Sequence, residues 1–307
     1  MHLPLSDGFE VPRTLRDSVA GIAADARTPP AIVSVSDVHG YLERARSALL
    51  TPRDSPTFDP VVVADGDGTL HWAGVDYVLV FNGDLVDRGP ANDEVLAMVA
   101  RLVREAPPGR VRVTLGNHEA IALSPDHFGF SNWYSGRVAP RERRRFLRLI
   151  VAGHVVAAYG GYNVTYAHAG SPEPYETSTV NAALVEAATD LLDAAGTPDD
   201  GAAQRRVLDD YPRVLGVGDG HPKGPGAGLV WLDFDHLPAD APPQVVGHTR
   251  HGRPRTKGNV FCQNVIRENL DGDGGEAAFV ETPASLSALV RRPDGGTDRI
   301  DLARFDR

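Results

Sequence analysis

The chain has 307 residues, of which 42% are hydrophobic and 23% charged, as in proteins that fold in water, and no apolar run reaches the ~18–20 residues that span a bilayer. Its 31 basic against 41 acidic residues give a net charge of −10, which disfavours binding to duplex nucleic acid. The single cysteine, Cys262, excludes an internal disulfide and all-cysteine zinc sites. Because the N-terminus also lacks a basic start followed by an apolar core, we expect a cytoplasmic protein without a membrane segment.

The first predicted elements follow a segment that we expect to be peripheral, residues 1–30. Arg27–Pro30 is typical of a linker into the main domain, residues 31–307. Ala31–Val35 is a short β-branched run that predicts a buried strand, and Tyr41–Leu50 has the apolar spacing of a helix.

The elements that follow alternate between strands and helices, which favours an α/β fold. The predicted helices are Asn92–Glu105 and a segment around Arg141–Arg148, whose five arginines form a solvated face or attract anionic substrates. Closing strands with Gly-rich turns are expected from Val260 to Val290. The strands predicted before them are Val61–Ala64, Tyr77–Phe81, Val111–Leu115, Val164–Ala167 and Gln244–Val246.

Five short polar clusters lie where predicted strands end, which is where α/β proteins place ligands. Carboxylate, imidazole and amide oxygen together suit Mn²⁺, Fe²⁺ or Zn²⁺, whereas calcium takes oxygen ligands alone. Six such ligands are too many for one tetrahedral zinc and fit two ions about 3.5–4 Å apart, bridged by one carboxylate. The clusters are Asp37-Val38-His39-Gly40, Gly83-Asp84-Leu85-Val86-Asp87-Arg88-Gly89, Gly116-Asn117-His118-Glu119, His168-Ala169-Gly170 and Gly247-His248-Thr249.

In this order the five motifs resemble those of the calcineurin-like metallophosphoesterases, in particular the branch of Ser/Thr protein phosphatases and diadenosine tetraphosphate hydrolases. The resemblance covers roughly residues 31–290, and Leu70–Gly74 is similar to a segment of the Shewanella-like protein phosphatases. Ser36 and Ala169 stand where the family has glycine, and both replacements are small. The resemblance implies a single domain of two packed mixed β-sheets flanked by helices, with the metal site at strand ends.

The resemblance also implies a role for each motif residue. One divalent ion would be held by Asp37, His39 and His248, and Asp84 would bridge it to a second ion. Asn117 and His168 would complete the second site, with manganese as the expected metal and iron or zinc as alternatives.

The implied reaction is attack of a metal-bridged hydroxide on phosphorus, in line with the leaving oxygen. His118 would protonate that oxygen as the general acid, oriented by Asp87, and Glu119 would orient the backbone. Arg88 would bind phosphate oxygens through its planar fork, and Asn117 would also face the substrate. Arg250 or Arg253 would supply a second phosphate contact.

The expected substrate is phosphoserine or phosphothreonine in a protein, and otherwise a small phosphate ester such as a dinucleoside polyphosphate or nucleotide. An open groove would favour protein, whereas a base-stacking pocket would favour nucleotides. Trp133 and Tyr134 are possible stackers, although packing in the core is the alternative. An inactive binding module is the hypothesis from a different class, and the intact ligand set argues against it.

Two other segments have competing interpretations. Asp65-Gly66-Asp67-Gly68-Thr69 matches the signature of haloacid-dehalogenase-type phosphatases, but a hairpin between Val61–Ala64 and Leu70–Trp72 explains the same residues. The Gly/Pro-rich stretch Gly216–Gly228, which contains Lys223, lacks the pattern of a phosphate-binding loop. It is either a flexible loop or a substrate-recognition loop.

Overall fold

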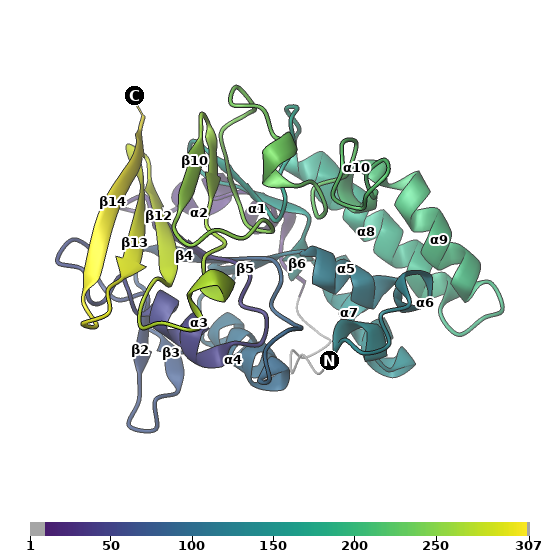
Figure 1. The fold of residues 1–307 in the computed structure, drawn as a ribbon, viewed down its shortest axis with the longest axis horizontal. Helices are drawn as coiled ribbons and strands as arrows, with labels where there is room; N and C mark the ends of the chain where they lie inside the picture. Colours follow the sequence, from purple (N-terminus) through teal and green to yellow (C-terminus); the bar gives the residue numbers. More distant parts are fainter. Residues whose placement is uncertain (1–9, 306–307) are drawn as a thin grey trace.

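Two mixed β-sheets pack together at the centre of the computed structural model, which describes residues 10–305 (Figure 1). In the described range the larger sheet has seven strands, in the spatial order β14 (Thr297–Arg304), β13 (Ser285–Arg291), β12 (Ala277–Thr282), β1 (Ala31–Val35), β4 (Tyr77–Asn82), β5 (Val111–Thr114) and β6 (Val155–Val156). The smaller has five, in the order β10 (Arg255–Lys257), β11 (Val260–Cys262), β9 (Gln244–Val246), β8 (Thr165–Ala167) and β7 (Ala158–Gly160). The predicted fold is therefore confirmed.

The sequence of the central strands explains the layered packing, because alternate residues of a strand face opposite sides of a sheet. On β1, Ile32 packs in the cluster between the two sheets, together with Tyr166 and Val245 of the smaller sheet. Its neighbour Val33 belongs to the cluster on the other face, which includes Leu96 of a helix. A strand buried on both faces reads as a continuous apolar run.

Helices cover the outer faces of the sheets. Figure 1 shows α8, α9 and α10 gathered on one side of the molecule, opposite the C-terminal strands β12–β14. The predicted helix Asn92–Glu105 is confirmed as α4, which buries its apolar stripe. The remaining helices of this group are α3 (Leu42–Leu49), α5 (Asn117–Leu123), α6 (Pro125–Phe128), α7 (Pro140–Val151), α8 (Thr177–Ala194), α9 (Asp200–Asp210) and α10 (Pro212–Leu215).

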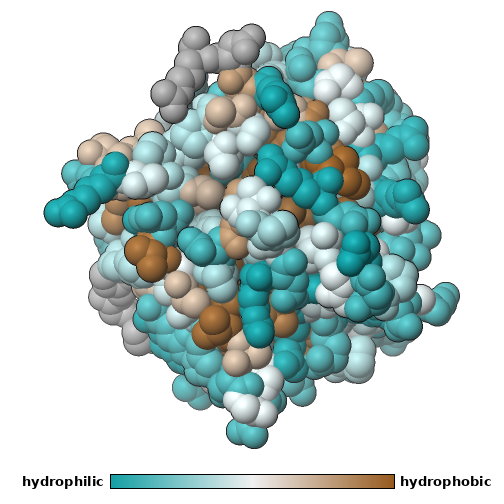
Figure 2. Space-filling view, turned by 90° about the vertical axis from the view of Figure 1, so that its left-hand side faces the viewer, coloured by the Kyte–Doolittle hydropathy of each residue, from teal (hydrophilic) through white to brown (hydrophobic). Residues whose placement is uncertain are grey.

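The C-terminal strands form one edge of the larger sheet. Strands β12 and β13 confirm the expected closing strands, and β12 pairs antiparallel with β1. Strand β14 extends the sheet beyond the predicted region, and its side chains alternate in charge, with Asp298, Arg299 and Asp301 exposed. Figure 2 shows the face on this side as mostly hydrophilic with scattered apolar residues. Charged side chains protect an edge strand against pairing with other chains.

The segment that we expected to be peripheral contributes to the core where the structure describes it. It forms two short helices, α1 (Arg13–Arg16) and α2 (Ala20–Ala23). Val19 and Ile22 are buried in the cluster between the sheets, and the Val19 N–H donates to the Gly160 carbonyl over 2.8 Å. Residues 1–9 of this segment lie outside the described range, and the domain boundary at residue 30 stays a prediction.

The predicted hairpin is present as a separate two-stranded sheet, β2 (Val62–Ala64) and β3 (Leu70–Trp72). Its turn is fixed by Asp65, whose carboxylate accepts hydrogen bonds from the N–H groups of Asp67 and Thr69 at 3.0 and 2.8 Å. Asp65 is therefore a turn residue, and the haloacid-dehalogenase interpretation is not supported. Among the helices of residues 10–305, none combines the length and the apolar character needed to cross a bilayer.

Candidate active site

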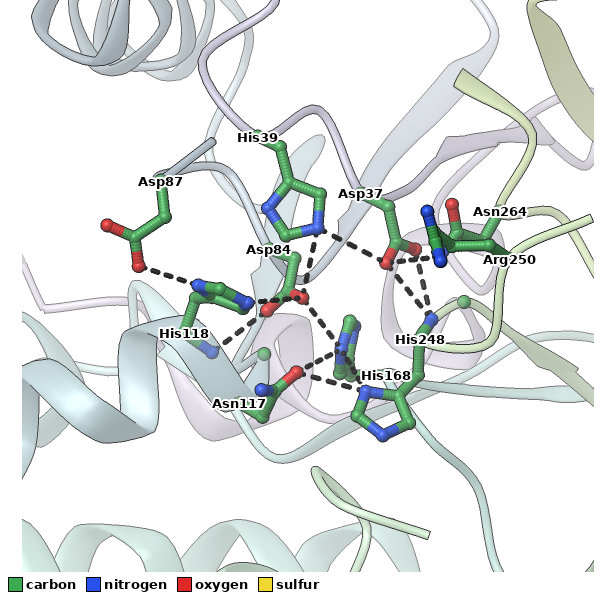
Figure 3. A network of polar contacts seen from close by, with 12 residues as sticks. Asp37, His39, Asp84, Asp87, Asn117, His118, His168, His248, Arg250 and Asn264 are labelled. Carbon is green, nitrogen blue, oxygen red and sulfur yellow. Dashed lines mark hydrogen bonds and ion pairs between the residues drawn. The ribbon is translucent and has the colours of Figure 1, made fainter. Parts of the chain in front are cut away.

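All six predicted metal ligands lie together at the strand ends (Figure 3). The loops after β1 and β4 supply Asp37, His39 and Asp84, and helix α5 supplies Asn117 from its first residue. His168 and His248 follow β8 and β9 of the smaller sheet. All six side chains are buried, so the two sheets share one polar centre.

The backbone of these loops is strained. Within the described residues, a positive φ outside glycine occurs only at site positions, namely Asp37 (53°), His39 (50°), Asp84 (54°), Asp87 (72°), Arg88 (70°) and His248 (62°). Such conformations cost of order 1–3 kcal/mol each and persist only where the surrounding structure imposes them. All of these strained residues lie at the site. This indicates that the loop conformations serve to direct the side chains toward one point, at some cost in stability.

Two motif glycines are required by close packing. A Cβ added to Gly83 would lie 2.5 Å from Nδ1 of His168, and one added to Gly116 would lie 2.3 Å from a carboxylate oxygen of Asp84. Neither space admits a side chain, so the loops can approach one another only with glycine at these positions.

Asp84 lies at the centre of the cluster. Its Oδ2 is 3.4 Å from Nε2 of His39 and 3.3 Å from Nε2 of His168. The opposite nitrogens of these rings, Nδ1, each lie 3.0 Å from a backbone carbonyl, of Val86 and Asn82 respectively. A neutral ring that donates Nδ1–H to a carbonyl presents a lone pair at Nε2, which is the usual arrangement of a metal-binding histidine.

His248 lies on the second side of the centre. Its Nδ1 is 3.0 Å from Oδ1 of Asn117 and 3.2 Å from Nε2 of His168. The resemblance led us to expect the His248 ring beside Asp37 and His39. In the structure only the backbone N–H of His248 contacts Asp37, at 3.1 Å from Oδ1. Two groups spaced for metal binding result, both containing Asp84: one with His39 and His118, the other with His168 and His248.

The donor set fits two divalent cations. The Nε2 atoms of His39 and His168 face carboxylate and amide oxygens, and together these atoms form a donor set that suits a divalent cation. Burial and the Asp84 charge raise the pKa of Asp37 to about 6. Burial opposes protonation of His168, but the Asp84 carboxylate outweighs it and raises the His168 pKa to about 9. Metal binding would replace these protons.

The predicted acid pair is formed beside this cluster. Nδ1 of His118 lies 2.6 Å from Oδ2 of Asp87, and its Nε2 points inward, 3.9 Å from Oδ2 of Asp84. Ser135 fixes the carboxylate, since its N–H and Oγ–H donate to Asp87 over 3.0 and 2.5 Å. Burial raises the pKa of Asp87, but the hydrogen bonds from His118 and Ser135 outweigh it and lower the value.

A cavity of about 280 Å³ opens onto these groups and is lined by the cations Arg88, Lys223 and Arg267. The Arg88 guanidinium stacks on Trp133 at 3.9 Å, and no carboxylate pairs with it among the residues described. Arg250, in contrast, is paired with a carboxylate, because its Nη1 lies 3.1 Å from Oε1 of Glu268. It lines the adjoining cavity of about 520 Å³.

Several residues of the site belong to no motif. Asn264 donates to Oδ1 of Asp37 over 2.7 Å, and Ser135, Lys223 and Arg267 complete the surroundings described above. No motif marks Asn264, Ser135 or Arg267 in the sequence, whereas Lys223 lies in the Gly/Pro-rich stretch that we considered as a substrate-recognition loop. Glu119 acts as predicted, accepting the N–H groups of Asp84 and Leu85 at 2.8 and 2.9 Å.

Two curated proteins resemble the chain in sequence. The chain is 29% identical over 100 residues to Shewanella-like protein phosphatase 2 of Arabidopsis thaliana, covering 32% of this chain and 23% of the relative. It is 29% identical over 178 residues to an uncharacterized protein of Schizosaccharomyces pombe, covering 52% and 50% of the two chains. The chain thus spans half the length of these relatives or less.

Solved structures show the same fold. The cold-active protein-tyrosine phosphatase of a psychrophilic Shewanella species superposes with a TM-score of 0.59 at 19% identity, covering 90% of this chain and 81% of that one. A point mutant of a cold-active protein tyrosine phosphatase gives the same TM-score at 17% identity, with the same coverage of both chains. The sequence model of the calcineurin-like phosphoesterases matches residues 30–193, more than half of the chain. The chain therefore belongs to the calcineurin-like phosphoesterase family.

Proposed function

We propose that this protein is a metal-dependent phosphatase that hydrolyses phosphoserine and phosphothreonine in proteins. The observation that carries the proposal is the buried His118–Asp87–Ser135 arrangement beside the metal ligands. A serine or threonine alkoxide is a poor leaving group and needs a proton as the P–O bond breaks. Hydrolysis of a phosphoanhydride releases a phosphate group, which is a stable anion, so this reaction depends far less on a general acid.

Six residues of the site are the proposed ligands of two metal ions. Asp37, His39, Asp84, Asn117, His168 and His248 would hold two cations, with Asp84 shared, and the mixed nitrogen and oxygen donors suit manganese, with iron or zinc as alternatives. When bound, such ions neutralise phosphate charge and lower the pKa of a water molecule toward neutrality. Asn264 and the Glu119 hydrogen bonds keep the loops of Asp37 and Asp84 in place.

His118 is the proposed general acid. The Asp87 carboxylate accepts its Nδ1–H and so leaves Nε2 as the position that carries and delivers the proton. Because Nε2 points toward Asp84, the proton lies on the side where the substrate oxygen would depart. Acid catalysis of this kind is typically worth about 10²–10⁴ in rate.

Arg88 and Arg267 are the proposed phosphate-binding arginines. They line one cavity with His118, and burial together with the Arg267 cation lowers the pKa of Arg88. An anion between them would relieve this repulsion. We therefore propose Arg267 for the role that we expected of Arg250 or Arg253. Arg250 is paired with Glu268, and Arg253 lines a different cavity.

A nucleotide or dinucleoside polyphosphate is the second candidate substrate. Phe130 lines the same cavity, is 38% exposed and stacks on Trp133 at 4.2 Å, so its outer face is open to a base. Trp133 itself packs against Phe130, Arg88 and His118, and Tyr134 donates to Asp93.

A substrate panel tests the proposal directly. Manganese-loaded protein is assayed with phosphoserine and phosphothreonine peptides, a phosphotyrosine peptide and diadenosine tetraphosphate. We expect the highest kcat/KM on phosphoserine or phosphothreonine. A clear preference for diadenosine tetraphosphate would reject the proposal in favour of the nucleotide candidate. Absence of turnover on every substrate, together with less than one metal ion per chain after loading, would indicate an inactive binding module.

A further inference from the structure

Lys223 lies at the mouth of the metal centre although it belongs to none of the five motifs. It lines the cavity of about 280 Å³ that contains Arg88 and His118. It also lines the adjoining cavity of about 520 Å³, and the two cavities share Lys223, His248 and Arg267. The ammonium group therefore stands where the inner site opens outward, on the side of His248.

The loop that carries Lys223 is closely packed rather than loose. The Gly228 N–H donates to the Gly216 carbonyl over 2.8 Å and closes the base of the loop. A Cβ added to Gly218 would lie 2.3 Å from the carbonyl oxygen of Gly224, so glycine is required there by a close approach of two backbone segments. The Lys223 carbonyl accepts the N–H of Asp233 over 3.0 Å, which fixes the lysine to the neighbouring chain.

The surroundings of the ammonium group are incomplete. The Nζ atom has no hydrogen-bond or ion-pair partner among the residues that the structure describes. Burial lowers the pKa of Lys223, whereas the more distant carboxylates of Asp84, Asp233 and Asp37 favour its charge. An unpaired, partly buried cation facing a cavity is costly unless an anion joins it there.

We propose that Lys223 binds a non-bridging oxygen of the substrate phosphate and makes the site selective for monoesters over diesters; this inference rests on the proposed function. A phosphate monoester carries about two negative charges near neutral pH, and a diester carries about one. Arg88, Arg267 and Lys223 present three cations to one cavity, which suits the monoester. The loop Gly216–Gly228 is then a substrate-recognition loop.

Kinetics on two aryl substrates test the selectivity. For Lys223→Met we expect kcat/KM on p-nitrophenyl phosphate to fall about 10- to 100-fold, mainly through KM, because a charge-assisted hydrogen bond is lost. The loss on bis(p-nitrophenyl) phosphate should stay below about threefold, and Lys223→Arg should recover part of the monoester activity. Lys257→Met is the matched control, since the Lys257 Nζ is already bonded to the carbonyls of Phe234 and Asp235 at 3.3 and 3.0 Å. Equal losses on both esters, or none, would overturn the proposal.

A second measurement does not depend on turnover. Lys223 and Lys257 are the only lysines of the chain, so acetylation by acetic anhydride can be followed at each by peptide mass spectrometry. Inorganic phosphate should slow acetylation of Lys223 in the metal-loaded protein several-fold and leave Lys257 unchanged. Protection of neither lysine, or of both alike, would overturn the role of Lys223. Protection in a protein that hydrolyses no phosphoprotein would instead reject only the proposed function.

Discussion

The ring of His118 and the carboxylate of Asp87 lie side by side next to the proposed metal ligands, with 2.6 Å between Nδ1 and Oδ2. They come from neighbouring strand ends, since Asp87 follows β4 and His118 lies in the first turn of α5, after β5. The contact occupies Nδ1 and leaves Nε2 of His118 for the proposed proton transfer, whereas the adjacent Asn117 is a proposed metal ligand.

Replacing His118 should therefore affect proton transfer and not metal binding. We expect His118→Gln to retain its metal and to lose about 10²–10⁴ in kcat on a serine phosphate. On p-nitrophenyl phosphate the loss should be much smaller, because that leaving group departs with little need of a proton. The measurement is kcat on both substrates together with metal content by elemental analysis.

Two variants serve as controls for this experiment. Asp87→Asn should show the same dependence on the leaving group, but more weakly, because Asp87 only orients the ring through its hydrogen bond to Nδ1. His168→Gln should lose metal and impair both substrates alike, because its Nε2 faces Asp84 and Asn117. Equal losses with lost metal in His118→Gln would identify His118 as a ligand instead.

Ser135 should have a smaller effect of the same kind. Its hydroxyl donates to Asp87 over 2.5 Å, and the side chain is fully buried. Removing one such hydrogen bond costs about 1 kcal/mol, so we expect Ser135→Ala to lower kcat on a serine phosphate about fivefold while keeping its metal. Full activity on serine phosphate would show that Asp87 is held by other contacts. Ser131→Ala is a nearby exposed control.

The proposed bridging role of Asp84 predicts the most severe loss among the proposed ligands. Asp84 belongs to both candidate metal groups, whereas His39 and His248 each belong to one. We expect wild-type protein to bind two ions per chain and Asp84→Asn to lose at least one, with kcat lower than in His39→Gln or His248→Gln. Elemental analysis after manganese loading measures this, and near-normal activity in Asp84→Asn would refute the bridge.

The sequence predicts the centre of this fold far better than its periphery. Strands β1 and β9 and helix α4 have the predicted bounds, because strong apolar patterns meet clear polar stops at their ends. Helix α8 was not predicted, and its buried positions include the small residues Ala187 and Ala188, which give little contrast between faces. Strand β14 was also missed, because its side chains are mostly charged or half-exposed and it is defined by pairing with β13.

The same distinction holds at the site. The clustering of the proposed ligands could be predicted because each lies in a short motif that follows a strand. Ser135 and Arg267 could not be predicted as site residues. They lie in short 3₁₀-helices outside the five motifs and come close to the site only through tertiary packing. The position of the His248 ring could not be predicted either, because the backbone of the motif lies near Asp37 but does not determine the direction of the side chain.

Trp133 should control the placement of Arg88. The guanidinium lies 3.9 Å from the centre of its ring, and such cation–π contacts are worth about 0.5–2 kcal/mol. We expect Trp133→Leu to raise KM for a phosphate monoester about 3- to 30-fold and Trp133→Phe to raise it less. His118 also stacks on this ring, so kcat will show whether the acid is disturbed as well. An unchanged KM in Trp133→Leu would show that Arg88 is positioned without the ring.

A buried carboxyl far from the motifs should make stability depend on pH. Glu281 of β12 is fully buried between the sheets and accepts hydrogen bonds from the Asn163 N–H at 2.6 Å and the Tyr166 hydroxyl at 3.0 Å. Burial outweighs these hydrogen bonds and raises the Glu281 pKa from its ordinary value of 4.5 to about 7. The folded protein therefore holds this proton more tightly than the unfolded chain.

This difference fixes the sign of the effect. Protonated Glu281 stabilises the folded protein fully below the unfolded pKa of 4.5, and this stabilisation is lost as the pH rises through about 7. The corresponding change in the free energy of unfolding is on the order of 3 kcal/mol. Glu281→Gln cannot ionise, so relative to wild type it should become more stable as the pH rises from about 5 to about 8. Urea unfolding of both proteins at the two pH values measures this, and comparing them cancels the titration of the shared metal ligands. A free-energy difference that stays constant between the two pH values would show that Glu281 ionises in the folded protein as readily as in the unfolded chain.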